Sequence, residues 1–236
     1  MFTVSESIIN SILRFSNSSI MKKVRLNTHI IKLASCFADY ESDVLPPDSR
    51  LVEYPFVFSR LVNQSKARLL DIGCSARHNF LVPTLCELGW EVWGIDIRDW
   101  AFSHTNFHLI KEDIRYSRFP SDILGYVVCI STLEHIGLSG YYGITTDDKD
   151  GDIMAGYKIA KLLKQGGKLL LTVPYSQDYI VKSGTKIFNS TRLHIVFPDF
   201  EVIDKQFYTL NKDKNCWQST SDISEEVVAC FEMVRK

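Results

Sequence analysis

The sequence predicts an α/β fold in which an open, mostly parallel sheet is covered by helices on both faces. Three observations indicate this fold. Between residues 67 and 175, short apolar runs alternate with segments of helical periodicity. The runs are apolar almost throughout, as strands buried on two faces require. Several runs end in an acidic residue, at the edge where open parallel sheets bind their ligands.

Size and charge narrow the class of protein. The chain has 236 residues, which suits a single domain with a well-buried core. Its net charge is -1 and it has no long run of Lys or Arg, which disfavours a dedicated nucleic-acid binder. No apolar run is long enough to span a bilayer, and the first 15 residues lack the pattern of a signal peptide. None of the six cysteines forms a Cys-x-x-Cys pair, which disfavours a zinc or redox motif. We therefore expect a cytoplasmic protein whose partner is a small molecule.

The N-terminal part of the chain is predicted to be helical. Apolar residues at helical spacing indicate helices over Ser5–Phe15 and Ile20–Ala38, and a third helix is expected over Asp48–Val62. We treat residues 1–236 as one domain, with residues 1–62 as a helical extension and residues 63–236 as the core. The extension is expected to cap the substrate side or to form a homodimer contact.

The core is predicted to contain seven strands. Five parallel strands are expected at Arg68–Ile72, Glu91–Asp96, Phe107–Lys111, Ile123–Ser131 and Lys168–Val173, the last stopped by Pro174. Helices are expected at Phe80–Leu88, at Ile153–Lys164, where Gln165-Gly166-Gly167 would end the helix, and at Ser190–Val196. Two β-rich segments, Phe200–Leu210 and Glu226–Val234, flank the polar loop Asn211–Ser224 and predict an antiparallel pair at the sheet edge.

The end of the first predicted strand carries the clearest chemical signal. Asp71 sits at the tip of a buried run and Gly73 follows in the turn. Glycine allows a ligand to approach the backbone closely. An acid at this tip suits a ligand with an amine rather than a pyrophosphate, and the amino-acid end of S-adenosylmethionine has such an amine.

Two further strands also end in acids. Asp96 closes the second strand, where a carboxylate can accept hydrogen bonds from both hydroxyls of a ribose. Asp113 follows the third strand and could meet the exocyclic amine of an adenine, with Ile114 against the ring. Any one of these acids is also compatible with a solvated strand end, but three in succession favour a nucleoside-binding site.

The ordered motifs LLDIGCS, VWGIDI, KEDI, VVCISTLEHIG and LLKQGGKLLLTVP resemble those of class I S-adenosylmethionine-dependent methyltransferases. The resemblance covers about Tyr54–Tyr175. The string STLEHIG further resembles a subgroup of methyltransferase-like proteins, some associated with surface-glycan or secondary metabolism. The resemblance implies a Rossmann-like seven-stranded sheet and S-adenosylmethionine as the cofactor, with S-adenosylhomocysteine as the product.

The resemblance also implies a set of cofactor contacts. The methionine portion would lie along the first motif, the ribose and adenine at the second and third strand ends, and the cofactor floor after the fourth strand. The implied residues are Asp71, Gly73, Cys74, Ser75, Asp96, Ile97, Asp113, Ile114, Ser131, Thr132 and Leu133. One departure concerns the first motif, in which Ser75 and Arg77 occupy positions that are usually glycine in the family.

His135 is the candidate catalytic residue, because the resemblance places it near the transferable methyl group. It could act as a general base on an acceptor hydroxyl, or it could be a structural residue of the Glu134-His135 pair. A metal site formed by this pair with Asp150 or Asp152 is a weaker alternative, and we expect no metal. Tyr141, Tyr142 and Tyr175 are candidate substrate contacts, because they follow the fourth and fifth strands.

The function expected from these features is methyl transfer, as O- or N-methylation, to a small molecule, sugar or secondary metabolite. A nicotinamide-dependent oxidoreductase is disfavoured, because the chain lacks Gly-x-Gly-x-x-Gly and Asp71 would repel a pyrophosphate. A degenerate module that binds the cofactor without catalysis, with a role in protein interaction, is the stronger alternative. The missing glycines of the first motif favour that alternative.

Overall fold

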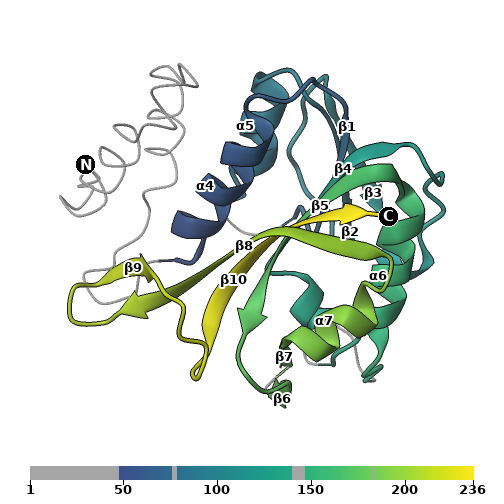
Figure 1. Cartoon of the computed structure of the whole chain (residues 1–236). Helices are drawn as coiled ribbons and strands as arrows, with labels where there is room; N and C mark the ends of the chain where they lie inside the picture. The colour runs from purple at the N-terminus through teal and green to yellow at the C-terminus, as the bar shows by residue number, and fades with distance from the viewer. Residues whose placement is uncertain (1–47, 76–78, 140–146, 183) are drawn as a thin grey trace.

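The structure is a computed structural model that describes residues 48–75, 79–139, 147–182 and 184–236 (Figure 1). The two helices expected over Ser5–Phe15 and Ile20–Ala38 lie outside the described residues, as do Arg77, Tyr141 and Tyr142. The third expected helix is present as α4 (Arg50–Leu61). No helix in the described ranges has both the length and the apolar character needed to cross a membrane.

The centre of the described molecule is an eight-stranded sheet with the order β3-β2-β1-β4-β5-β10-β8-β9. The first five of these strands are mutually parallel, and β10, β8 and β9 continue the sheet in antiparallel fashion. Their bounds are β1 (Arg68–Ile72), β2 (Glu91–Asp96), β3 (Phe107–Lys111), β4 (Leu124–Ile130), β5 (Leu163–Tyr175), β8 (Phe200–Asn211), β9 (Cys216–Ser219) and β10 (Val227–Arg235). This arrangement confirms the open, mostly parallel sheet and its antiparallel C-terminal pair, with one strand more than the seven expected.

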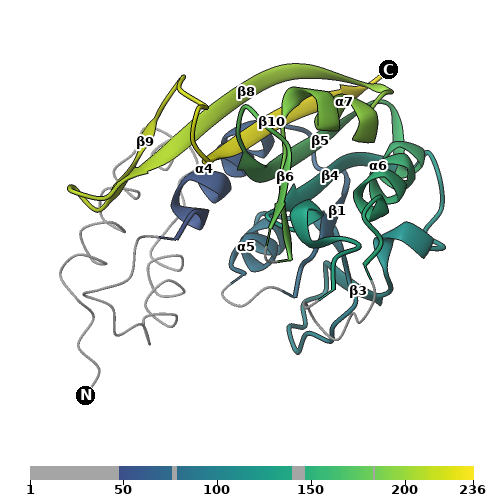
Figure 2. The ribbon, with the colours of Figure 1, turned by 90° about the horizontal axis from the view of Figure 1, so that it is seen from below.

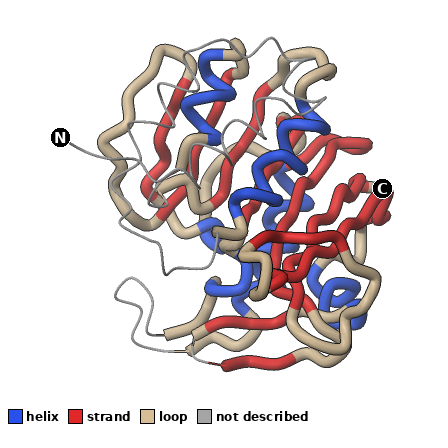
Figure 3. Tube along the Cα trace, turned by 90° about the vertical axis from the view of Figure 1, so that its left-hand side faces the viewer, coloured by secondary structure: helices blue, strands red, loops and turns tan. Residues whose placement is uncertain are grey.

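Helices cover both faces of the sheet, as expected. On one face, α4 and α5 (Leu81–Glu87) form a buried apolar cluster with β1 and β2. On the other face, α6 (Gly151–Leu162) and α7 (Ser190–Val196) pack with β4, β5 and β10 in a second cluster. Figures 1 and 2 show the two helix pairs on opposite sides of the sheet, and Figure 3 shows helices lying across the strands when the molecule is viewed from one side.

The transition from α6 to β5 differs from the expectation. The helix ends at Leu162 and β5 begins at the next residue, so Gln165-Gly166-Gly167 lie in the strand rather than closing the helix. Pro174 does not stop β5 either. It pairs with Val228 of β10, and its carbonyl accepts a hydrogen bond of 2.8 Å from the Phe188 amide. Pairing with β10 therefore extends the strand past Pro174, whereas residues 164–167 form an irregularity between the pairs Leu124–Leu163 and Tyr126–Lys168.

Two short antiparallel elements were not predicted. β9 lies inside the expected polar loop Asn211–Ser224 and pairs with the end of β8. A hairpin of β6 (Ile180–Lys182) and β7 (Thr185–Ile187) follows β5. Both segments are short, and all three residues of β6 are exposed. They lack the apolar alternation by which a strand is recognised in a sequence.

A buried ion cluster fastens the β6–β7 hairpin to the helical face. Asp152 at the start of α6 accepts hydrogen bonds from Lys186 of β7 (2.7 Å) and from Arg192 of α7 (2.6 and 2.8 Å). The Lys186 and Asp152 side chains are fully buried, and the Lys186 ammonium also donates to the carbonyl of Ile136 at 2.7 Å. The cluster therefore holds the hairpin against the segment that follows β4.

Candidate functional site

The carboxyl ends of β1, β2 and β3 meet at one edge of the sheet, and each carries one of the predicted acids. Asp71 is buried near the end of β1, Asp96 is the last residue of β2, and Asp113 comes two residues after β3. The three strands are neighbours in the sheet. The edge also lies beside the switch point between β1 and β4, where open α/β sheets bind ligands.

The turn after β1 has the conformation that the glycine was expected to provide. Gly73 has φ +82°, and its amide donates to the carbonyl of Ile95 at 2.8 Å. A Cβ at this position would lie 2.2 Å from Oγ1 of Thr132. The amide of Ser75 donates to Oδ2 of Asp96 at 3.0 Å. The turn thus requires glycine, and it is bonded directly to the acid of the neighbouring strand.

Asp71 is held in a protected, low-dielectric position. Its Oδ2 accepts a hydrogen bond of 3.2 Å from Asn79, which also donates to the carbonyl of Cys74 at 2.8 Å. Burial raises the pKa of Asp71 to about 7, and the nearby charge of Asp96 acts in the same direction. A cationic ligand at this carboxylate would favour its ionised form and offset the cost of burial.

Asp96 is already bonded by a residue of its own motif. Oδ1 accepts from the amide and Nε of Arg98 at 2.9 Å each, and Oδ2 accepts from Nη2 of Arg98 at 2.8 Å as well as from Ser75. A carboxylate offers about four accepting positions, so these bonds use all of them. A ribose at this site would have to replace the guanidinium of Arg98.

The same arrangement recurs at the next strand. Asp113 accepts from the amide of Arg115 at 2.9 Å and from its guanidinium at 2.7 and 3.1 Å. Arg115 also pairs with Asp148 at 2.8 Å. The triplet Asp-Ile-Arg occurs at both strand ends, as residues 96–98 and 113–115. This repeated triplet is the signal in the sequence from which the two arginine pairs could have been found.

We expect the substitution Arg98→Ala to strengthen the binding of S-adenosylhomocysteine about three- to tenfold. The variant no longer has to give up the Arg98–Asp96 bonds on binding, and hydrogen bonds to charged groups are worth about 1.5–3 kcal/mol in favourable cases. Isothermal titration calorimetry of both proteins measures the effect. Arg98→Lys keeps the charge but loses the bidentate contact with Asp96. Its affinity for S-adenosylhomocysteine should lie between those of the wild-type protein and Arg98→Ala. Weaker binding by Arg98→Ala would instead make Arg98 a ligand contact.

Some of the remaining predicted cofactor residues lie at the carboxyl edge of the sheet, and others have side chains buried in the core. The side chains of Cys74, Ile114 and Leu133 are buried in the apolar clusters, and Cys74 Sγ lies against Gly94. Ile97 is 37% exposed beside Asp96. Thr132 lies against the turn at Gly73. A cofactor at this edge would therefore meet Cys74, Ile114 and Leu133 through their backbone more than through their side chains.

Glu53 of α4 lies beside the candidate site, where it contacts the ends of two strands. It is fully buried, and its Oε1 accepts from the hydroxyls of Ser131 (2.5 Å) and Thr172 (2.7 Å). Its Oε2 accepts from Ser49 at 3.1 Å and pairs with Arg50. Glu53 thus ties α4 to the ends of β4 and β5. Its single place in a helical pattern gives no sign of these contacts, which arise only on folding.

The Glu134-His135 pair lies in a single 3₁₀ turn, η2 (Leu133–His135), directly after β4. Nδ1 of His135 lies 3.0 Å from the carbonyl of Gly184 in the β6–β7 hairpin, and Nε2 lies 4.0 Å from Oε1 of Glu134. Burial lowers the pKa of His135, so the imidazole stays neutral at physiological pH. Burial raises the pKa of Glu134 to about 8.

Tyr175 is the last residue of β5 rather than part of the loop after it. Its ring packs against Phe207 and Phe231, with centroids 5.3 and 5.7 Å away. It lines a groove of about 610 Å³ between β8 and the segment after β9, together with Phe207 and Ile223. Tyr175 is therefore largely a packing residue, with one side facing this groove.

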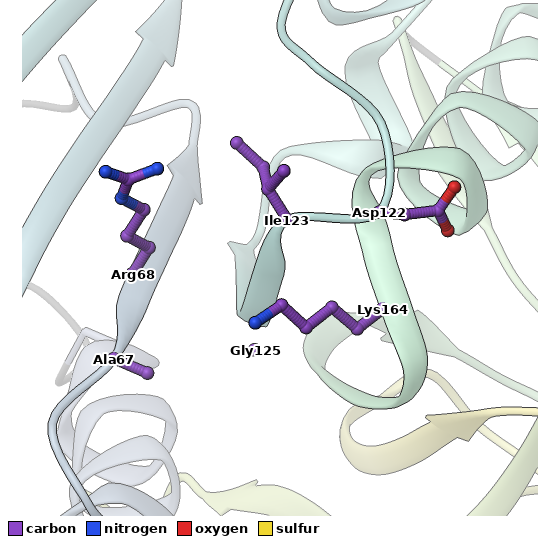
Figure 4. Close-up of a pocket in the computed structure, with 6 residues that line it drawn as sticks. All are labelled: Ala67, Arg68, Asp122, Ile123, Gly125 and Lys164. Carbon is purple, nitrogen blue, oxygen red and sulfur yellow. The ribbon is translucent and has the colours of Figure 1, made fainter.

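A second hollow, of about 380 Å³, lies at the opposite edge of the sheet (Figure 4). Its lining residues are Ala67 and Arg68 at the start of β1, Asp122, Ile123 and Gly125 at the start of β4, and Lys164 near the start of β5. None of the predicted acids lies at this amino edge. The candidate site is therefore the carboxyl edge, where Asp71, Asp96 and Asp113 gather.

Solved structures with a similar fold include several methyltransferases. Burkholderia thailandensis 1,6-didemethyltoxoflavin-N1-methyltransferase, solved with 1,6-didemethyltoxoflavin and S-adenosylhomocysteine, has a TM-score of 0.57 and 12% identity, over 100% of this chain and 92% of its own. The N-methyltransferase NodS from Bradyrhizobium japonicum WM9 has a TM-score of 0.55 and 14% identity, over 79% of this chain and 96% of its own. The [4+2]-cyclase SpnF has a TM-score of 0.55 and 13% identity, over 83% of this chain and 85% of its own.

These similarities confirm the class I methyltransferase fold that the sequence motifs implied. At such low identity they show the fold alone, and the presence of a cyclase among the similar structures illustrates that one fold carries different chemistries. No curated protein matches the chain at a significant level. The profile of the family DUF268, described as "Caenorhabditis protein of unknown function", matches residues 98–229. Because the match spans more than half of the sequence, the chain belongs to the DUF268 family.

Proposed function

We propose that this protein is an S-adenosylmethionine-dependent methyltransferase that acts on a small-molecule, sugar or secondary-metabolite acceptor through O- or N-methylation. The main support for the proposal is the hydrogen-bonded contact between the carboxyl ends of β1 and β2. The glycine turn at Gly73 is bonded through Ser75 to Asp96, with the buried Asp71 beside it. At this edge, Asp71 can pair with the amine of a ligand, and the turn at Gly73 leaves room for it. Asp96 can accept hydrogen bonds from a ribose.

The residues at this edge fit S-adenosylmethionine at its methionine end. Asp71, with a pKa raised to about 7 by burial, suits an ammonium group, and the turn at Gly73 lets the backbone approach it. The ribose would be held by Asp96 once Arg98 has left it, and the adenine would lie near Asp113 and Ile114. When bound, the cofactor supplies an electrophilic methyl group, and the protein's own part is to position the acceptor in line with it.

A degenerate module that binds the cofactor without catalysis is the second candidate. The pairing of Asp96 with Arg98 and of Asp113 with Arg115 favours it, because both nucleoside-binding acids are engaged within the chain itself. The replacement of two motif glycines by Ser75 and Arg77 points the same way. Such a module would serve in protein interaction rather than catalysis.

Calorimetry with S-adenosylmethionine and S-adenosylhomocysteine tests the proposed function. We expect both to bind, and we expect methyl transfer when the protein is screened against amine and hydroxyl acceptors. Absence of binding by both ligands would remove the methyltransferase proposal and the cofactor-binding module together. Binding of both ligands without turnover on any acceptor would favour the module.

His135→Ala is expected to lower turnover about a hundredfold if His135 is the general base, because general-base help typically supplies about 10²–10⁴ in rate. Affinity for S-adenosylhomocysteine should change little. If His135 is the base that sets the pH dependence, the wild-type rate should fall only below about pH 6.5, the usual value for histidine, because burial lowers its pKa. The pH profiles of both proteins measure this. Near-normal turnover of His135→Ala across that range would leave His135 as a structural residue.

The domain arrangement and cellular setting complete the proposal. Residues 63–236 form the catalytic core, and residues 1–62 cap it or form a homodimer contact. The apolar side chains of α4 share a buried cluster with β1 and β2, which supports treating α4 and the core as one domain. We propose a cytoplasmic location. We also propose that the acceptor-side contacts include Tyr141, Tyr142 and Tyr175.

A further inference from the structure

Glu134 holds an unsatisfied oxygen inside the protein. Among the described residues, its Oε2 is the one buried side-chain nitrogen or oxygen without a hydrogen-bond partner. The side chain is 3% exposed. Buried polar groups in folded proteins are almost always hydrogen-bonded, so each exception calls for a specific explanation.

The neighbouring groups do not supply the missing partner. Glu53 and Arg50 of α4 are the charged groups that influence Glu134 most, and they are already paired with each other. Burial raises the pKa of the Cys129 thiol in β4, and the charge of Glu134 acts in the same direction, so this group stays protonated. His135 faces the other oxygen of the carboxyl, Oε1. Lys186 of β7 is bound to Asp152 and to the carbonyl of Ile136.

Glu134 follows closely on a residue that packs against the candidate site. Thr132, two residues earlier, is the residue against which the turn at Gly73 packs. The charge of Asp71 acts on Cys129 together with that of Glu134, so the two acids share one neighbourhood at the ends of β1 and β4. Glu134 therefore lies between the β1 turn, helix α4, whose Glu53 and Arg50 act on it, and the β6–β7 hairpin, to which the adjacent His135 is bonded.

We propose that Glu134 is the catalytic residue that binds the methyl acceptor, and that the acceptor class is an amine whose N–H group bonds to Oε2. This inference rests on the proposed methyltransferase function. An amine satisfies the unpaired oxygen. As an ammonium ion it also balances the charge of the cluster, because Glu53 is already neutralised by Arg50.

The proposed step balances as follows. The ionised Glu134 takes a proton from the acceptor ammonium at Oε2, which leaves a nitrogen lone pair. That lone pair forms the N–C bond to the methyl group, while the C–S bond breaks and its electron pair stays on the sulfur. The product is a methylated ammonium ion, a neutral thioether and a protonated Glu134. No additional oxidant, reductant or co-reactant is needed.

His135 is placed to return the carboxyl to its ionised state. A carbonyl only accepts hydrogen bonds, so the contact with Gly184 requires Nδ1 of His135 to carry the proton. Nε2 is then the basic nitrogen, and it faces Oε1 of Glu134 at 4.0 Å. In this arrangement His135 is a positioning and proton-relay residue, and Glu134 contacts the acceptor.

Sinefungin provides a probe that needs no known acceptor. It is an analogue of S-adenosylmethionine in which an amine-bearing carbon replaces the methylated sulfur. Its ammonium group therefore projects toward the place where an acceptor amine would bind. If Oε2 of Glu134 faces that place, wild-type protein should bind sinefungin at least tenfold more tightly than S-adenosylhomocysteine at pH 8.5. Calorimetry with each ligand gives this ratio.

The preference for sinefungin over S-adenosylhomocysteine should also increase as the pH rises. Burial raises the pKa of Glu134 to about 8, so the carboxylate that attracts the ammonium is formed only as the pH rises through that value. A primary aliphatic amine stays protonated over the same range. We expect the preference for sinefungin to grow from pH 6.5 to pH 8.5. This measurement uses wild-type protein, so it does not depend on the folding of a variant.

Glu134→Gln should bring the two affinities within about twofold of each other while S-adenosylhomocysteine still binds. The matched control is Glu91→Gln, at the opposite end of β2, where the carboxylate is 41% exposed and pairs with Arg68. It should keep the full preference. A wild-type protein without preference, or a Glu134→Gln protein that retains it, would overturn the role of Glu134. Failure of wild-type protein to bind either ligand would instead overturn the proposed function.

Discussion

Replacement of Asp96 by alanine is expected to weaken the binding of S-adenosylhomocysteine at least tenfold. The carboxylate at the end of β2 would accept hydrogen bonds from two ribose hydroxyls, and each bond to a charged group is worth about 1.5–3 kcal/mol. The loss is reduced by the bonds that Arg98 must give up in the wild-type protein. A tenfold change, about 1.4 kcal/mol, is therefore the lower limit that we expect.

The control for this experiment lies three residues further along the chain. Asp99 is 79% exposed and pairs with Lys111, so Asp99→Ala removes a carboxylate of the same kind without touching the site. It should leave the affinity unchanged. Circular dichroism should show that both variants keep the fold. Unchanged affinity of Asp96→Ala in calorimetry would exclude Asp96 from the site, whereas opposite effects of Asp96→Ala and Arg98→Ala would confirm their competition.

Gly73→Val is expected to abolish cofactor binding and to destabilise the protein. A branched side chain in this turn would obstruct the close approach of the ligand to the backbone. The structure adds that it would first collide with Thr132, since a Cβ would lie 2.2 Å from Oγ1 and 2.7 Å from Cγ2. The backbone has φ +82°, which a β-branched residue strongly disfavours. Strain and overpacking together should cost about 2–5 kcal/mol.

Gly89 provides a comparison in which a side chain would cause backbone strain but no steric collision. Gly89 has φ +84°, and a Cβ there would meet nothing within 4 Å. Gly89→Ala should therefore cost only about 1–2 kcal/mol of conformational strain and leave cofactor affinity intact. Thermal unfolding and calorimetry of both variants test the comparison. If Gly73→Val folds and binds S-adenosylhomocysteine normally, the methionine portion is not bound at this turn.

Much of the core could be predicted from the sequence because its elements are defined by local patterns. Buried parallel strands are continuous apolar runs, so β1, β2 and β3 were predicted residue by residue and β4 to within one residue at each end. The start of β5, in contrast, lies five residues before the predicted one. The acids at the strand ends could be placed at one edge because parallel strands share a direction. The glycine turn followed from the short motif after β1. These features depend on the order of neighbouring residues, which a sequence displays directly.

The tertiary structure alone decided how the site is completed. β9 and the β6–β7 hairpin form through partners that lie elsewhere in the chain, and β5 passes through Pro174 because β10 pairs with it. Glu53 bonds to Thr172, which is 119 residues away. The unpaired oxygen of Glu134 is likewise visible only once every neighbour is in place. Hydrogen bonds and burial depend on distance in space, and for residues far apart in the chain that distance is fixed only by the folded sheet.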